Sequence, residues 1–165
     1  MIVLADQHAG RFVDGSEVDS QAGWCFAVIE SDEEAQDALT CDDNSKKWPI
    51  ASLLKRYPTA KAFWGPVVLE HTDPGYIGAE KHSNNTGELS AQVMALAYAH
   101  QRMETDQDSA AVIYYDSTYA AHMTTGYWKP SSNIQLVQIS QQAFIHTRRL
   151  GCLKEVHVKA HTGVI

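Results

Sequence analysis

The chain has 165 residues, of which 44% are hydrophobic and 20% charged, the composition of one folded domain and not of a disordered segment. Its longest apolar run, Ala110 to Tyr115, is far shorter than the roughly 20 residues of a membrane helix, and the start, MIVLADQHAG, does not predict a signal peptide. The net charge of −7 at pH 7 speaks, at first sight, against a nucleic-acid binder, because phosphate contacts need Lys and Arg.

The pattern of apolar residues predicts five strands. In chain order they are Arg11–Asp14, Trp24–Glu30, Ala62–Glu70, Ala111–Tyr115 and Glu155–Lys159. We expect the third strand to pair with the second as a hairpin partner, with Asp73-Pro74-Gly75 as a turn.

A polar insert at about residues 31–59 separates the second strand from the third. It contains one apolar patch, Trp48–Leu54, which predicts a short helix begun by Pro49. Seven carboxylates in or beside this insert equal the whole negative excess of the chain: Glu30, Asp32, Glu33, Glu34, Asp37, Asp42 and Asp43. Without them the chain is neutral, so local basic patches remain open, and we interpret the acidic run as a solvated loop.

Three helices follow. The first begins near Thr86, where an apolar stripe repeats at helical spacing along Leu89, Val93, Leu96, Ala97 and His100. The second is expected from Ser117 to about Gly126, and the third from about Ser132 to Leu150, with Gly151 in the position after its end. Strands and helices in this order predict an α/β fold, a mixed sheet with helices packed against it.

The cysteines, Cys25, Cys41 and Cys152, are scattered and odd in number. They predict neither a disulfide framework nor a zinc site, and we interpret them as reduced thiols. With no targeting segment expected, an intracellular location follows, cytoplasmic in preference to nuclear.

Three carboxylates stand where a strand or helix meets a turn. Asp14 precedes Gly15, Glu88 lies near the start of a helix, and Asp116 ends a strand. Each alone has an ordinary structural role, as a turn residue, a first-turn acid or a helix cap. Brought together, they would need a cation, and hard oxygen ligands suit Mg²⁺ or Mn²⁺. Two such ions about 4 Å apart support phosphodiester cleavage.

Four segments carry a family resemblance. FVDGS, SNNTGELSA, YYDSTYA and VKAHTG resemble, in the same order, the signature segments of type 1 ribonucleases H, which cut the RNA strand of RNA/DNA hybrids. The similarity runs from about Arg11 to the C-terminus, interrupted by the insert. It implies a ribonuclease H-like fold with a five-stranded mixed sheet flanked by helices, a metal-dependent endonuclease activity with Mg²⁺ or Mn²⁺ as cofactor, and an RNA/DNA hybrid as partner.

The resemblance also implies roles for single residues. Asp14, Glu88 and Asp116 match the family's metal-binding carboxylates. His161 matches the histidine that helps protons or product to leave, and an ordinary polar loop residue is its alternative interpretation.

The substrate-binding residues are expected elsewhere. Asn84 and Asn85 match the asparagines that read the minor groove of the hybrid, where the RNA 2′-hydroxyls lie. Contacts to the nucleic-acid backbone are expected, as further candidates, from Ser16, Thr118, Trp128 and Lys129. For Trp128 a role in the core or at its rim is an equal alternative.

The chain departs from the family pattern near its C-terminus. The family carries a fourth aspartate at the start of a last helix, beyond the histidine segment, whereas this sequence ends at Ile165. We expect a piece of a longer protein, such as a retroelement protein, with a neighbouring domain as possible partner; a site of three carboxylates is the alternative. Two other functions stay open: a catalytically weak or inactive nucleic-acid-binding module, and, disfavoured by Asn84 and Asn85, an exonuclease of the same fold.

Overall fold

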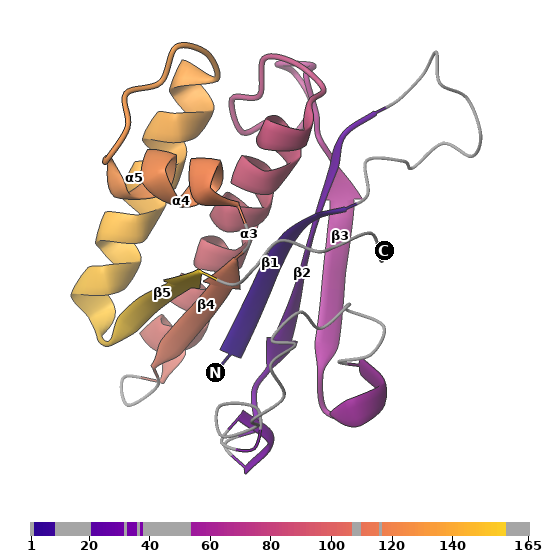
Figure 1. The fold of residues 1–165 in the computed structure, drawn as a ribbon, viewed down its shortest axis with the longest axis vertical. Coiled ribbons are helices and arrows are strands. Elements are labelled where there is room, and N and C mark those ends of the chain that lie inside the picture. The colour runs from indigo at the N-terminus through magenta and orange to yellow at the C-terminus, as the bar shows by residue number, and fades with distance from the viewer. Residues whose placement is uncertain are drawn as a thin grey trace.

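The computed structural model describes residues 2–8, 21–31, 33–35, 37, 54–106, 110–115 and 117–157. The elements in chain order are β1 (Ile2–His8), β2 (Gly23–Ile29), β3 (Lys61–Pro66), α3 (Asn84–Thr105), β4 (Ala111–Tyr115), α4 (Thr118–Thr125), α5 (Ile134–Leu150) and β5 (Leu153–His157). The strands pair in the order β3-β2-β1-β4-β5, and the helices gather on one side of the sheet (Figure 1). The predicted α/β class is confirmed.

Strand β1 is the centre of the sheet. It runs antiparallel to β2 and parallel to β4, so the sheet is mixed. The apolar start Ile2–Ala5 suits such a position, because a central strand is covered on both faces. The strand expected at Arg11–Asp14 lies outside the described residues.

Strand β3 pairs antiparallel with β2, as predicted, with Phe26 opposite Phe63. It ends at Pro66 and not at Glu70, because its partner β2 begins at Gly23, the residue opposite Pro66. The turn predicted at residues 73–75 forms, with the Gly75 N–H donating to Asp73 Oδ1 at 2.7 Å. It lies beyond β3, on the way to α3.

Helix α3 begins at Asn84, two residues before the predicted start at Thr86, because Ser83 acts as N-cap and accepts from the Thr86 N–H at 3.1 Å. Leu89, Val93 and Leu96 are buried, as the stripe predicts. Ala97 is exposed, so that part of the predicted stripe is wrong. No described helix is both long enough and apolar enough to cross a membrane.

The ends of α4 agree well with the prediction and those of α5 less so. Ser117 caps α4, and Gly126 ends it in the left-handed conformation with φ 82°. Helix α5 starts at Ile134, two residues later than predicted, because Asn133 is itself left-handed with φ 53°. Gly151 ends α5 with extended backbone, φ 168°, so a left-handed end is not formed there.

Both faces of β2 are buried, each by a different part of the chain. Phe26 and Val28 pack with Leu96 of α3 on the helix side. Ala27 and Ile29 pack on the other side against Tyr57 and its neighbours. Because successive side chains of a strand point to opposite faces, this one strand joins two apolar clusters.

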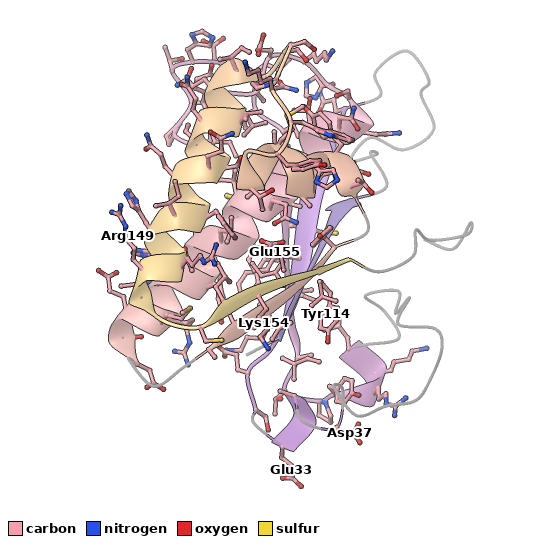
Figure 2. All side chains as sticks on the ribbon, turned by 60° about the vertical axis from the view of Figure 1, so that its left-hand side comes forward. Glu33, Asp37, Tyr114, Arg149, Lys154 and Glu155 are labelled. Atoms are coloured by element: carbon pink, nitrogen blue, oxygen red, sulfur yellow. The ribbon has the colours of Figure 1, made fainter. Side chains whose placement is uncertain are left out.

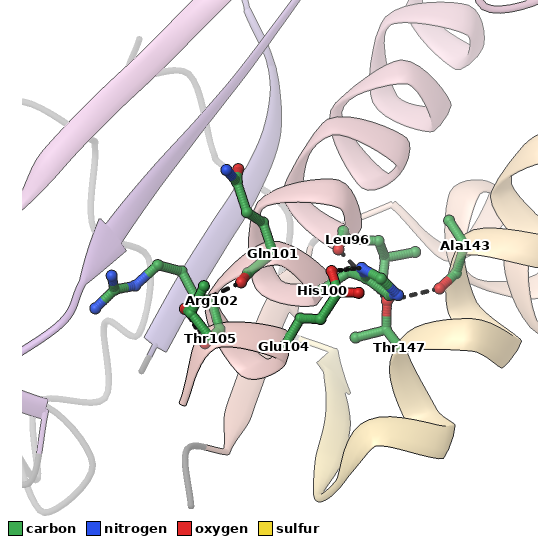
Figure 3. A network of polar contacts seen from close by, with 8 residues as sticks. All are labelled: Leu96, His100, Gln101, Arg102, Glu104, Thr105, Ala143 and Thr147. Carbon is green, nitrogen blue, oxygen red and sulfur yellow. Dashed lines mark hydrogen bonds and ion pairs between the residues drawn. The ribbon is translucent and has the colours of Figure 1, made fainter. Parts of the chain in front are cut away.

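A buried threonine of α5 lies in the contact between α5 and α3, as Figure 3 shows. The Thr147 hydroxyl, 0% exposed, donates to the Ala143 carbonyl at 2.7 Å in its own helix. The Leu96 carbonyl of α3 lies 3.4 Å away, a long contact. A buried hydroxyl needs an acceptor, and the Ala143 carbonyl supplies it within α5.

The interpretation of the whole acidic run as a solvated loop is wrong for Glu30. Its carboxylate accepts from the Tyr98 hydroxyl at 2.7 Å and from Arg102 Nε at 2.8 Å, and Lys61 Nζ lies 3.5 Å away. The Tyr98 hydrogen bond is the main cause that lowers the pKa of Glu30, and burial raises the pKa of Tyr98 to about 12. The second strand is thereby tied to α3.

Candidate active site

The carboxyl ends of β1 and β4 lie side by side in the middle of the sheet. The two strands are parallel, and Ala5 pairs with Tyr115, the last residue of β4. Residues that follow parallel strands meet at one edge of a sheet, where ligands of α/β proteins commonly bind. Helix α4 starts at the same edge, with Ser117 as its N-cap.

Glu88 of α3 reaches this edge. It is half-buried, and its Oε2 accepts from the Ser117 hydroxyl at 2.6 Å. This short distance is typical of a hydroxyl that donates to a carboxylate. The same Ser117 oxygen accepts from the Ala120 N–H at 3.0 Å. The Ser117 side chain therefore both caps α4 and holds the Glu88 carboxylate at the start of that helix.

Four predicted site residues, Asp14, Ser16, Asp116 and His161, lie outside the described residues. Within the described part of the chain, no three His, Cys, Asp or Glu side chains are placed to share a metal ion. Of the three predicted metal ligands, only Glu88 belongs to the described residues to which this finding applies.

The predicted asparagine pair begins α3. Asn84 and Asn85 are exposed, and they precede Glu88 by one helical turn. Thr118, also exposed, is the first residue of α4 and directly follows Ser117. The structure thus brings the start of α3 and the start of α4 together through the Glu88–Ser117 hydrogen bond.

Trp128 and Lys129 are exposed in the connection between α4 and α5, so Trp128 is not a core residue, and its place at the rim of the core stays an alternative. The His122 ring lies 4.6 Å from the Trp128 ring and 4.8 Å from that of Tyr127, which is 76% exposed. Sequence reasoning missed His122 and Tyr127. The aromatic residues close to Gly126 were the available signal.

Strand β1 carries a carboxylate that sequence reasoning also missed. Asp6 follows Ala5, and Ala5 pairs with Tyr115, the residue before Asp116. The described register ends at this pair, so Asp6 is the first residue of β1 beyond its pairing with β4. An acid directly after the apolar run Ile2–Ala5 was the signal in the sequence.

Glu155 of β5 carries a carboxylate whose oxygens are both buried. Neither of its carboxylate oxygens meets one among the described residues, and the same holds for the amide of the fully buried Gln92 on α3. Burial raises the pKa of Glu155 to about 8, and the nearby Gln92 amide offsets this only in part, since its geometry falls short of a formed hydrogen bond. The sequence pattern marked Glu155 only as a strand residue.

The chain was compared with family models, curated proteins and solved structures, and similarity was found to solved structures. No protein-family model and no curated protein matches the chain. Among solved structures, the crystal structure of RNase H1 from the halophilic archaeon Halobacterium salinarum NRC-1 is similar, with a TM-score of 0.45 and 13% identity over 96% of this chain and 84% of that chain. At that score and identity, the similarity assigns neither a family nor an activity to this chain.

Proposed function

We propose that this protein is a metal-dependent endoribonuclease that hydrolyses the RNA strand of RNA/DNA hybrids. The observation that carries the proposal is the 2.6 Å hydrogen bond from Ser117 to Glu88. It joins two of the four sequence segments that resemble type 1 ribonucleases H, SNNTGELSA and YYDSTYA, at the carboxyl ends of the central strands. These segments lie 29 residues apart in sequence at this contact.

Glu88, the proposed metal ligand that the structure describes at this edge, is of a type that suits a divalent cation. Glu88 offers a hard carboxylate oxygen, and Mg²⁺ and Mn²⁺ prefer such ligands. We propose that Asp14, Glu88 and Asp116 hold the metal. When bound, it would act as a Lewis acid at the scissile phosphate and lower the pKa of a water molecule.

The other proposed residues bind the hybrid or move protons. Asn84 and Asn85 donate and accept hydrogen bonds in the minor groove, which distinguishes RNA from DNA through the 2′-hydroxyl. Backbone contacts come from Ser16, Thr118, Trp128 and Lys129, and the last two, exposed beyond α4, offer an aromatic face and a positive charge. His161 exchanges a proton with the leaving oxygen or with solvent.

A catalytically weak nucleic-acid-binding module within a larger retroelement protein is the second candidate. The net charge of −7 favours it, because an isolated nuclease gains affinity from a positive surface. Such a module would bind the hybrid and leave it uncut when a metal is present.

Cleavage of a labelled RNA/DNA hybrid tests the proposal. The substrate is incubated in Mg²⁺, in Mn²⁺ and in EDTA, beside an RNA duplex of the same sequence. We expect metal-dependent cutting of the RNA strand of the hybrid alone. Binding of the hybrid without any cutting would favour the module, and neither binding nor cutting would reject both.

A pair of variants tests which acid of the N-terminal segment is the metal ligand. We expect Asp14→Asn to abolish cleavage and Asp6→Asn to keep it within about threefold, because the family resemblance rests on Asp14. Circular dichroism checks that both variants fold. The reverse result would assign the ligand to Asp6, which directly follows Ala5, the partner of Tyr115 in β4.

A further inference from the structure

Asn133, the N-cap of α5, combines a strained backbone with a buried side chain. Its φ of 53° and ψ of 38° are left-handed, and among the described residues it alone has positive φ without being glycine. Its side chain is 1% exposed. A residue keeps such a conformation only where its surroundings determine it strongly, and these positions gather at functional sites.

The Asn133 side chain joins two segments far away in sequence. Its Oδ1 accepts from the Glu80 N–H at 3.0 Å, and its Nδ2 donates to Thr86 Oγ1 at 3.0 Å. Glu80 returns the contact, because its Oε2 accepts from the Ile134 N–H at 2.8 Å. The start of α5 is thus fastened to the loop before α3 and to the first turn of α3.

The residues on either side of the asparagine pair belong to this hydrogen-bond network. Thr86 Oγ1 lies 2.7 Å from Ser83 Oγ, the cap of α3, so Asn133 and Ser83 share one buried threonine. Asn84 and Asn85 are the two residues between that cap and that threonine. Both are exposed, whereas Thr86 is 0% exposed. The buried contacts of their neighbours fix the backbone from which the two exposed amides extend.

We infer that Asn133 is a positioning residue that holds the first turn of α3 so that Asn84 and Asn85 meet the minor groove of the hybrid. The inference rests on the proposed function. Asn133 does not hold Glu88 in the same way, since Ser117 anchors that carboxylate separately at 2.6 Å. Loss of the Asn133 side chain should therefore weaken substrate binding and spare the chemical step.

The main variant is Asn133→Gly, which keeps the left-handed backbone and removes both side-chain hydrogen bonds. Steady-state cleavage of the hybrid by the full chain should show KM raised about tenfold and kcat within about threefold. Asn133→Asp keeps the acceptor for the Glu80 N–H and loses the amide donor to Thr86. Its KM should therefore lie between the KM of the wild type and that of Asn133→Gly. Thr86→Val removes the matching acceptor, and its effect should not add to that of Asn133→Gly.

Gln141→Ala is the matched control. The Gln141 side-chain amide, like that of Asn133, forms a hydrogen bond to another helix, but its acceptor is the Met123 carbonyl of α4, at 3.0 Å, and not a residue of α3. Its KM should stay at the wild-type value. An unchanged KM in Asn133→Gly, or a lower kcat at unchanged KM, would overturn the inference; the second result would link Asn133 to the chemical step.

Amide hydrogen exchange separates this inference from the proposed function, since it needs no substrate. Thr86 N–H donates to Ser83 Oγ and Gly87 N–H to the Ser83 carbonyl at 3.0 Å. Both amides should exchange at least about tenfold faster in Asn133→Gly, with α5 amides beyond Val137 unchanged. If the wild-type chain neither binds nor cuts the hybrid, the proposed function fails. Faster exchange would then support the positioning of α3, and unchanged exchange would overturn it.

Discussion

At the residue scale, the Glu88–Ser117 hydrogen bond assigns two separable roles to two side chains. Glu88 is a proposed metal ligand, whereas the Ser117 hydroxyl donates to Glu88 and accepts from the Ala120 N–H in the first turn of α4. A ligand and the group that orients it should respond differently to substitution, because the orienting group changes affinity and the ligand itself is required.

We expect Glu88→Gln to abolish cleavage and Ser117→Ala to lower the rate roughly 10- to 100-fold, with partial recovery at high Mg²⁺. Ser117→Ala also loses a helix cap, which costs about 1 kcal/mol of folding free energy. Ser117→Thr keeps the hydroxyl and serves as control. Cleavage rates over a Mg²⁺ titration measure the effect, and wild-type Mg²⁺ dependence in Ser117→Ala would refute the orienting role.

At the element scale, the parts of the fold that local chemistry determines were predictable. Helix α4 lies between Ser117 and Gly126 because a serine cap and a left-handed glycine are signals within the segment itself. The start of α5 at Asn133 was not predictable, since its conformation depends on Glu80 and Thr86, both about 50 residues earlier. The same reason explains why Glu155 looked like an ordinary strand residue.

The burial of the Glu155 carboxyl group on β5 should make folding stability depend on pH. The pKa of Glu155 is about 8 in the folded protein, against 4.5 for an ordinary glutamate. The stabilising effect of its proton is present in full below pH 4.5 and is lost as the pH rises through 8. In that window the slope reaches about 1.4 kcal/mol per pH unit.

Urea unfolding at several pH values, followed by circular dichroism, tests this expectation. Glu155→Gln should remove most of the decline in unfolding free energy between pH 5 and pH 8, a window taken from the folded and ordinary pKa of Glu155. Glu33→Gln, an exposed acid at the far end of the molecule, is the control and should keep the wild-type decline. An equal decline in both variants would show that other groups cause the pH dependence.

At the scale of the whole molecule, the described acids Glu33 and Asp37 lie at the opposite end of the sheet from the Glu88–Ser117 contact. Strand β2 runs antiparallel to β1, and its last residue, Ile29, pairs with Ile2 at the start of β1. The described residues that follow β2 are therefore at the end away from Glu88, where Figure 2 shows Glu33 and Asp37. The charges could be read from the sequence, but their position relative to Glu88 could not, because it depends on how the strands pair.

This separation predicts how hybrid binding should respond to salt. The Debye length is about 8 Å at physiological ionic strength, so carboxylates at the far end of the sheet act only weakly on a bound hybrid. Glu33→Gln with Asp37→Asn should change the affinity by less than about twofold at 0.15 M salt.

Lys129→Gln, near the end of α4, should lower the affinity for the hybrid and reduce the slope of log Kd against log salt by about 1, because one phosphate contact is lost. Titrations of a labelled hybrid in Ca²⁺ measure both. A large gain in affinity from the acidic pair would mean that the far end of the molecule faces the nucleic acid, and that the site assigned around Glu88 is not where the hybrid binds.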